Sequence, residues 1–500
     1  MGKTFQDFLA VGDDWKARMN FIHAFIEEYK SSTIYKDAEV AFEYARKRNR
    51  TICEYQKLLY TVSGKAVPDN YSANWKMTSN FFYRFITQEV QYVLGNGVTW
   101  YKSDTPDKMG ENFDTDLQKI AKYALIGGVA FGFWNLNHMD VFKITEFAPL
   151  YDENNSAMMA GVRFWQISSD KPLRATLYEL DGYTEYIWSH GEGEIMKPKT
   201  PYILKMKTTK ADGTMIYDYS NYPTFPIVPF WGNDSKQSEL IGIREQIDCY
   251  DLIKSGFAND VDDASQIYWV IQNAGGMDEI DLVKFVERMK TVRAAIVEDD
   301  GAKAEAHTVE VPYESREKLL DRLSKDLYRD AMALDTERIV SGATTATQIK
   351  AAYEPLNAKA DEFEYCVLEF LDDLLAVAGI TDEMPTFTRS MMINKAEEIS
   401  NVLQCVNYLD PDYITQKTLT ILGDGDKAFD MIDKIHNDEE LKELLLAQRA
   451  NRLQKKYYEA SAQKSGGSDD DANNTYTASG GIDRRRFNGG DYTKNGNQNE

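Results

Sequence analysis

The hydrophobic periodicity of the chain changes twice, and this restricts the folds that are open to it. Up to about residue 125, apolar residues such as Phe21 and Phe25 recur at helical spacing. Between residues 141 and 231, short segments rich in aromatic and β-branched residues are separated by turns such as Asp181-Gly182, which predicts an antiparallel sheet. From residue 239 onward helical spacing returns. The pattern predicts an α+β fold in which a sheet lies between two helical regions.

The net charge of the chain limits the ways in which it can interact with nucleic acid. The 500 residues include 57 Lys and Arg against 80 Asp and Glu, which gives a formal net charge of −23. This acidity argues against a protein that grips nucleic acid over its whole surface, because such binding requires Lys and Arg to neutralise phosphates. A protein past which DNA slides, or one with a local basic patch, remains compatible with it.

The spacing of the cysteines and the character of the N-terminus are typical of a protein in a reducing compartment. The four cysteines are far apart and form no C-x-x-C pair, so we expect free thiols rather than a zinc or redox site; they are Cys53, Cys249, Cys366 and Cys405. The N-terminus lacks the apolar region of a signal peptide, and the glycine-broken stretch at residues 124–134 is too short to cross a membrane. We expect a protein of the cytoplasm, or of something assembled there.

The helical part after the sheet has a distinctive order. Two charged helices, at about 239–265 and 313–334, flank a small module, and a loop at 335–343 follows. Residues 344–378 then read as one long helix, in which Pro355 predicts a kink. Further helices are expected at about 395–408, 412–422 and 437–457. The Gly-, Ser-, Asp- and Asn-rich residues 466–500 cannot bury a core and are predicted to be disordered.

Catalytic signatures are not found. The sequence has no Walker A pattern, no G-x-G-x-x-G, no H-E-x-x-H and no G-x-S-x-G, and its five histidines are scattered. Residues 259–263 could supply carboxylates to a metal, or form a solvated acidic face. The aromatic residues of the sheet suit one face of a core or a sugar-stacking platform; they are Trp165, Tyr183, Tyr186, Trp188 and Trp231.

A local basic cluster lies between the two charged helices. It consists of Lys284, Arg288, Lys290 and Arg293, of which the first two are four residues apart and share a helical face. The cluster is either the exposed face of an ordinary helix or a patch that meets DNA or an acidic partner.

The order of these segments resembles the portal proteins of tailed bacteriophages, which form a ring at one vertex of the head. The resemblance covers roughly residues 75 to 405. It rests on the helix at 80–94 that runs into Gly95-Asn96-Gly97 and a strand at 98–101, on residues 124–131, on the segment 225–230 with the acidic helix after it, and on Thr345-Ala346-Thr347-Gln348-Ile349. Family members often carry an acidic residue at the position of Gln348.

The resemblance implies a portal-type architecture. Residues 1–237 would form a wing of N-terminal helices and antiparallel sheet, 238–264 and 313–334 two stem helices, and 265–312 a small α/β clip between them. Residues 335–343 would be a tunnel loop, 344–408 a long kinked wing helix with a strand, 409–464 a helical crown, and 465–500 a disordered tail.

The function implied is a channel without chemistry of its own. A dodecameric ring would pass double-stranded DNA during packaging and ejection, in a virion assembled in the host cytoplasm, with no cofactor and no membrane. The partners would be the terminase large subunit, which would hydrolyse the ATP, the head–tail adaptor, the scaffold and the major capsid protein.

The resemblance also suggests roles for individual residues. Arg338, Ser341, Gly342 and Thr344 would face DNA from the tunnel loop, and Lys284, Arg288, Lys290 and Arg293 would dock partners at the clip. Asp248, Asp251, Asp260, Glu317 and Asp321 would form an acidic channel wall that repels phosphates.

Two alternatives remain open at this stage. One is an aromatic-lined hydrolase that uses paired carboxylates from residues 141–231, although no spacing pattern identifies an acid and a base. The other is a structural capsid or adaptor protein without a channel.

Overall fold

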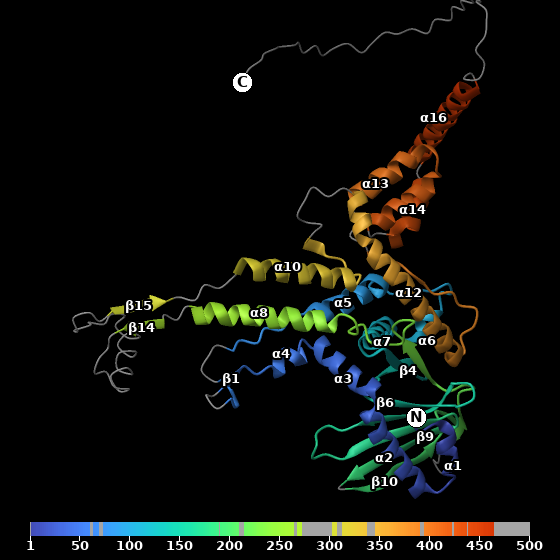
Figure 1. The fold of residues 1–500 in the computed structure, drawn as a ribbon. Coiled ribbons are helices and arrows are strands. Elements are labelled where there is room, and N and C mark those ends of the chain that lie inside the picture. The colour runs from blue at the N-terminus through green and yellow to red at the C-terminus, as the bar shows by residue number, and fades with distance from the viewer. Residues whose placement is uncertain are drawn as a thin grey trace, which may run out of the picture. The chain divides into compact units, whose positions relative to one another are not determined.

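The computed structural model describes most of the chain, and its residues divide into two compact units. The described residues are 2–60, 64–69, 74–189, 191–209, 215–264, 268–272, 303–307, 313–337, 346–390, 395–422, 425–437 and 439–464. Unit 1 is Met1–Met392 and unit 2 is Ile393–Glu500 (Figure 1).

Short capped helices open unit 1. The side chains of Thr4, Asp14 and Ser32 accept hydrogen bonds from the first turns of three successive helices, which satisfies amides that have no partner inside the helix. The elements before the sheets are α1 (Phe5–Ala10), α2 (Trp15–Ser31), α3 (Thr33–Ala45), α4 (Arg50–Glu54), β1 (Leu58–Tyr60), β2 (Ala66–Pro68), α5 (Phe81–Leu94), β3 (Val98–Thr99), α6 (Thr105–Met109) and α7 (Phe113–Gly127).

A five-stranded antiparallel sheet follows the order β10-β9-β8-β7-β6, so each strand pairs with its sequence neighbour. Buried and part-exposed residues alternate along β9, as expected when only one face is covered. Apolar side chains of α1 and α2, including Phe8 and Ile22, cover that face. The strands are β6 (Phe147–Tyr151), β7 (Met158–Trp165), β8 (Leu173–Glu179), β9 (Gly182–Ser189) and β10 (Glu192–Thr200).

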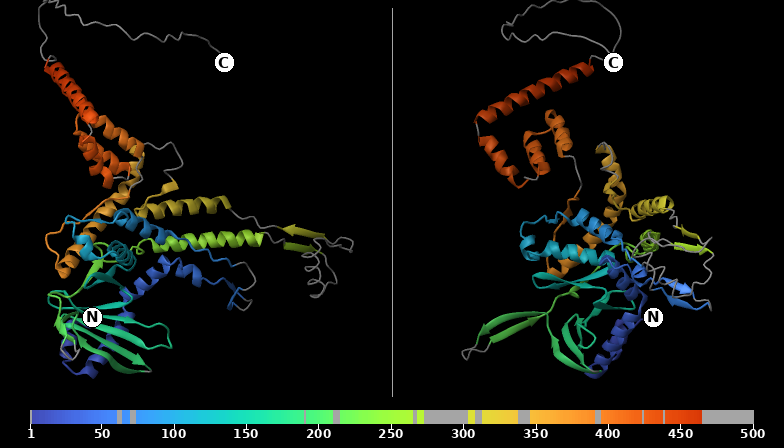
Figure 2. Two further views of the ribbon diagram at one scale, coloured as in Figure 1. Left: turned by 180° about the vertical axis from the view of Figure 1, so that it is seen from behind. Right: turned by 90° about the vertical axis from the view of Figure 1, so that its left-hand side faces the viewer.

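A three-stranded sheet of order β13-β4-β5 forms the centre of unit 1. Its middle strand, β4, is buried at six of seven positions because helices pack against it. A Cβ at Gly132 of this strand would lie 2.9 Å from the ring of Phe370, so only glycine fits there. The strands are β4 (Val129–Asn135), β5 (His138–Lys143) and β13 (Ile227–Trp231), and the separate hairpin of β11 (Ile203–Thr209) and β12 (Met215–Ser220) projects from the rest of the unit (Figure 2).

The remaining elements of unit 1 are mainly long helices. They are α8 (Arg244–Ala264), β14 (Tyr268–Gln272), β15 (Lys303–His307), α10 (Tyr313–Asp330), α12 (Ala346–Ala378) and β16 (Thr386–Phe387). β14 pairs with β15, and β16 pairs with β3. The 33-residue α12 is about 50 Å long at the usual helical rise, and Pro355 lies inside it. α12 packs on α5, β4 and β13, so the main core joins the central sheet to these helices.

Unit 2 is helical and has little core of its own. Its elements are α13 (Lys395–Gln404), η1 (Cys405–Asn407), α14 (Pro411–Leu422), η2 (Gly425–Lys427), α15 (Ala428–Asn437) and α16 (Glu439–Lys464). Among the residues described in this unit, the buried apolar side chains are those of Ile414 and Ala428.

The α+β class expected from the sequence is confirmed, with some changes at element ends. The expected helix at 239–265 begins as a helix at Arg244, after a turn, and the expected strand at 98–101 is only Val98–Thr99. In the part of the chain that the structure describes, no helix has both the length and the apolar character needed to cross a membrane.

Candidate functional site

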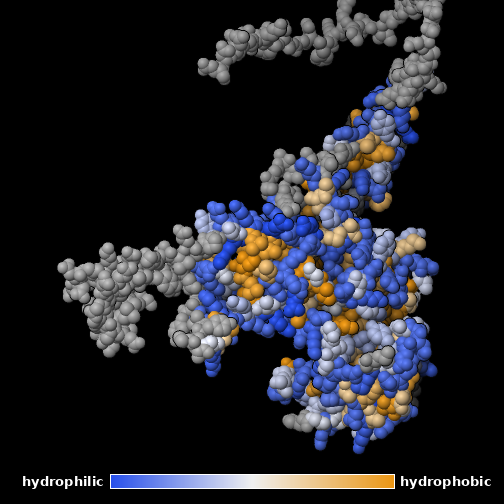
Figure 3. Space-filling view, in the orientation of Figure 1, coloured by the Kyte–Doolittle hydropathy of each residue, from blue (hydrophilic) through white to orange (hydrophobic). Residues whose placement is uncertain are grey.

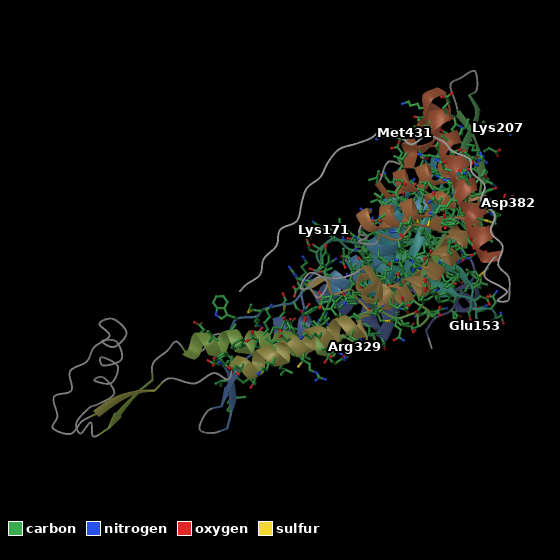
Figure 4. The ribbon with its side chains drawn as sticks, turned by 90° about the horizontal axis from the view of Figure 1, so that it is seen from above. Glu153, Lys171, Lys207, Arg329, Asp382 and Met431 are labelled. Carbon is green, nitrogen blue, oxygen red and sulfur yellow. The ribbon has the colours of Figure 1, made fainter. Side chains whose placement is uncertain are left out.

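The two charged helices α8 and α10 run antiparallel along each other. Gln246 near the start of α8 donates to Asp330 at the end of α10 (2.6 Å), and Arg316 near the start of α10 pairs with Asp260 near the end of α8. Figures 1 and 4 both show the helices side by side, and Figure 4 labels Arg329. At the usual rise the pair is roughly 30 Å long.

Aromatic side chains fix one end of this helix pair to α5. The ring of Phe81 meets that of Tyr250 edge-on, with centroids 5.0 Å apart, and Phe85 meets Tyr328 in the same way at 5.3 Å. Arg84 also donates to the hydroxyl of Tyr328. One ring from each helix therefore rests on the same face of α5, which sets the direction of the pair.

A row of polar side chains on α8 holds an extended segment of the chain. The backbone amide of Ser79 donates to Asp251 (2.9 Å), that of Met77 to Ser255 (2.9 Å) and that of Trp75 to Asn259 (2.6 Å). Four helical residues rise about 6 Å and two extended residues span about 6.6 Å, so the two repeats match. We call the acceptors Asp251, Ser255 and Asn259 the α8 ladder.

The expected channel-wall residues divide into inward-facing and exposed side chains. Asp251 is fully buried, where it also accepts a hydrogen bond from Asn49, and burial raises the pKa of its carboxyl. Asp248 accepts a hydrogen bond from Thr51 (2.7 Å) and another from Tyr44. Both carboxylates therefore bind other parts of unit 1. By contrast, Asp260 is partly exposed beside Arg316, and Glu317 and Asp321 are exposed on α10.

The charge of the helix pair is concentrated on one helix. α8 carries six acidic and two basic residues, whereas α10 carries five of each. Several bases of α10 lie within ion-pair distance of acids on the same helix, such as Arg329 beside Asp326 at 2.7 Å. Exposed apolar side chains interrupt the polar surface: Val261 on α8 is 54% exposed and Leu319 on α10 is 45% exposed. Figure 3 shows apolar surface over this region.

Gln88 fixes the chain where it leaves α10 toward the expected tunnel loop. Its amide donates to the carbonyl of Leu334 (3.0 Å) and accepts from the amide of the same residue (2.9 Å). A cavity of about 400 Å³ adjoins this point. Its lining includes side chains of both charges: Arg84, Lys254, Asp321, Asp335 and Glu337.

A buried lysine joins three elements at a second cavity of about 390 Å³. The Nζ of Lys359 on α12 lies 2.8 Å from Glu89 on α5 and 2.8 Å from Glu239 ahead of α8. Burial raises the pKa of Glu89 to about 7, against the opposing effect of Lys359. Burial lowers the pKa of Lys359, but the attraction of both carboxylates outweighs it, so the net shift is upward.

Several expected site residues lie outside the described residues. These are the tunnel-loop residues Arg338, Ser341, Gly342 and Thr344 and the clip residues Lys284, Arg288, Lys290 and Arg293. Of the clip, the structure describes β14 and β15.

The aromatic residues of the sheet contribute mainly to packing. Tyr186 and Trp188 are buried in the core under α2, where the ring of Trp188 also contacts that of His23. Trp165 is 36% exposed, and Lys236 lies over the ring of Trp231. Glu179, an acid of the same region, is paired with Lys199 at 3.2 Å.

Two of the carboxylates expected near residues 259–263 have other partners. Asp260 pairs with Arg316, and Asp262 accepts from the indole of Trp75 at 3.3 Å. Within the residues that the structure describes, no group of three or more His, Cys, Asp and Glu side chains is arranged to hold a metal ion.

Sequence reasoning missed the α8 ladder and the buried Lys359. A signal for the ladder was present, because Ile243, Ile247, Asp251, Ser255 and Asn259 follow one another at steps of four and all are buried. Polar residues thus continue the buried face of the helix, which indicates that they face other polar groups.

Comparison with known proteins places this architecture in a family. The model of the family "Phage portal protein, SPP1 Gp6-like" matches residues 41–450, which include the helix pair, the central sheet and most of unit 2. The chain belongs to this family of phage portal proteins, whose members are structural rather than catalytic.

Curated relatives agree with the family match. The chain is 24% identical over 394 residues to the portal protein of Bacillus phage SPP1, covering 70% of this chain and 74% of that protein. It is 31% identical over 185 residues to the portal protein of Clostridium phage phiCD119, covering 35% of this chain and 41% of that protein. The match thus spans less than half the length of the Clostridium phage protein.

Among solved structures, the chain is similar to a chain from the neck of a native GTA particle computed with C12 symmetry. The identity is 10% and the TM-score 0.38, with 67% of this chain and 88% of that chain covered.

Proposed function

We propose that this protein forms the portal ring at one vertex of a phage capsid, through which double-stranded DNA enters during packaging and leaves during ejection. The observation that carries the proposal is the antiparallel helix pair α8–α10. At one end of the pair, aromatic rings fix both helices on α5. At the opposite end, the chain continues from α8 to β14 and returns from β15 to α10, and these two strands pair with each other. This arrangement lies within the family match.

The surface of the α8–α10 pair suits a position between the neighbouring subunits of a ring and its central channel. Exposed apolar residues such as Val261 and Leu319 are typical of a surface that another protein covers. Exposed acids such as Glu317 and Asp321 repel phosphates and let DNA pass without sticking. In this proposal the wall is formed by such exposed acids, whereas Asp251 holds the subunit together.

The sequence has no nucleotide-binding motif, so the ATP hydrolysis would belong to a partner, and the other partners are those that the resemblance to portal proteins implies. A terminase would supply the ATP hydrolysis and would dock at the clip, on or near Lys284, Arg288, Lys290 and Arg293. The head–tail adaptor would later occupy the same end, while the scaffold and major capsid protein would surround the wing. The ring would be dodecameric and would assemble in the host cytoplasm.

Imaging tests the ring directly. The purified full chain would be examined by negative-stain microscopy, and its subunits counted by native mass spectrometry. We expect closed rings with a central hole. A compact monomer under conditions that also contain the scaffold protein would contradict the proposal, and so would a particle without a hole, which would favour a structural protein without a channel.

Deletion of residues 339–343 tests the loop. We expect rings to form normally, because Gln88 fixes the chain at Leu334 ahead of the deleted residues. Packaging of DNA into proheads should be blocked, since the loop is proposed to approach the DNA. Normal packaging by the deletion variant would remove this loop from the mechanism.

A further inference from the structure

Helix α16 is long, and the rest of unit 2 contacts it along one side. The guanidinium of Arg452 donates to the carbonyl of Leu409 (2.7 Å), and Lys456 lies over the ring of Tyr408. Leu446 and Leu453 lie roughly 100° to 120° around the helix from Arg452 at the usual 100° per residue. They are 60% and 64% exposed.

These exposed leucines belong to a regular seam. Leu446, Ala450 and Leu453 follow one another at spacings of four and three residues, and all are exposed. This is the spacing by which helices pack along one another. An exposed seam of this kind on a 26-residue helix is expected to be covered by another helix.

The two edges of the seam differ in chemistry. Counted at 100° per residue, Glu443 lies roughly 60° to one side of Leu446, and Arg449 lies roughly 60° to the other. Glu443 shares its edge with Ala447, a small residue that permits close approach. Arg449 lies between the seam and Lys456, which faces the ring of Tyr408. All four side chains are exposed.

A helix with one acidic edge and one basic edge is suited to contacts between neighbouring copies in a ring. In a head-to-tail ring each copy presents one edge to its neighbour on one side and the opposite edge to its neighbour on the other. Glu443 and Arg449 are six residues apart, about 9 Å along the helix, so a stagger of this size brings the acid of one copy beside the base of the next.

We propose that α16 packs beside α16 of the neighbouring copies of this chain, with Glu443 of one copy facing Arg449 of the next and the leucine seam covered between them. The inference rests on the proposed ring and adds a contact to it. The partner is a second copy because one helix carries both halves of a complementary pair on opposite edges.

Charge reversal tests this contact in the full chain. Glu443→Arg and Arg449→Glu should each lower the fraction of chain in rings several-fold at a fixed concentration near the assembly midpoint, measured by native mass spectrometry. The double variant should restore most of that fraction, because it exchanges the two charges. Lys455→Glu is the matched control, since this exposed residue lies on the side of α16 opposite Leu446 and should have no effect.

Cross-linking gives an outcome that does not depend on weakened assembly. The test uses a chain in which the exposed Cys53, Cys249 and Cys405 are replaced by serine. With Glu443→Cys and Arg449→Cys added, treatment with a short bis-maleimide should give a ladder of multimers joined between positions 443 and 449, identified by peptide mass spectrometry. Either single variant should give no such ladder. Rings of the unmodified chain, together with no 443–449 cross-link in the double variant, would overturn the α16 contact and leave the proposed function intact. A chain that forms no rings even when the scaffold protein is present would overturn both.

Discussion

At the scale of the residue, Glu89 makes the stability of unit 1 depend on pH. Its side chain is 3% exposed, and burial raises its pKa from the ordinary 4.5 to about 7. The folded state therefore holds this proton more tightly than the unfolded state does. The resulting stabilisation is fully present below pH 4.5 and is lost as the pH rises toward 7.

Glu89→Gln is expected to remove this part of the pH dependence. The free energy of unfolding of the wild-type chain should contain a fall of at most roughly 3 kcal/mol from this group between pH 4.5 and 7, and the variant should lack it. Denaturant titrations at several pH values measure the difference. Glu111→Gln, an exposed carboxylate that does not line the cavity beside Glu89, is the control. Equal pH slopes for the wild type and Glu89→Gln would contradict the prediction.

At the scale of the element, the α8 ladder decides how firmly the helix is attached to the body of unit 1. Asp251→Ala would leave the buried Ser79 amide without its acceptor. The buried Asn49 side chain would lose one of its hydrogen bonds but would still donate to the Ser79 carbonyl (3.2 Å). Each unpaired donor costs roughly 1–3 kcal/mol, so we expect a loss of about 2–5 kcal/mol in the free energy of unfolding.

Ser255→Ala removes one acceptor only, for the Met77 amide, and should cost about 1–2 kcal/mol. Lys254→Ala on the same helix, outside the ladder, serves as the control. Denaturant unfolding measures all three variants. A change for Asp251→Ala no larger than that for Lys254→Ala would show that the ladder contributes little.

The two hydrogen bonds between Gln88 and Leu334 are expected to limit the motion of the segment after α10. Gln88→Glu keeps an acceptor for the Leu334 amide but replaces the donor to the Leu334 carbonyl with a second acceptor. Hydrogen exchange of residues 333–337 should become faster by about tenfold or more, which corresponds to roughly 1.4 kcal/mol. Gln91→Glu, on a more exposed part of the same helix, is the control. Unchanged exchange at Leu334 would mean that other contacts fix this segment.

At the scale of the whole molecule, the sequence predicts what depends on local patterns. Short segments rich in aromatic and β-branched residues, separated by turns, indicated the sheet. Helical spacing indicated α8, α10 and the long α12, each to within about five residues of its ends. Contacts between residues far apart in the sequence could not be predicted in this way. The Trp75–Asn259 hydrogen bond joins residues 184 positions apart, and an extended segment such as the one around Trp75 has no hydrophobic period to reveal its partner.

The environment of the acidic residues on α8 and α10 was predicted less completely than the fold, because it also depends on residues far apart in the sequence. The acidic character of α8 is visible in its composition, but the inward direction of Asp248 and Asp251 depends on Tyr44, Thr51 and Asn49, which come from a distant part of the chain. Whether an acid faces solvent is decided by such partners and not by its own helix. Glu317 and Asp321, on the neighbouring helix α10, are exposed.

The α8 ladder also determines which positions can vary. The ladder side chains bind backbone amides, which every residue except proline possesses. Residues 75, 77 and 79 can therefore exchange side chains without loss of these hydrogen bonds, whereas a proline at any of the three would break one. Apart from the Trp75 indole, which donates to Asp262, these contacts depend on side chains of the helix. Related chains should therefore vary more at positions 77 and 79 than at Asp251, Ser255 and Asn259, which accept only residues that can still receive a hydrogen bond.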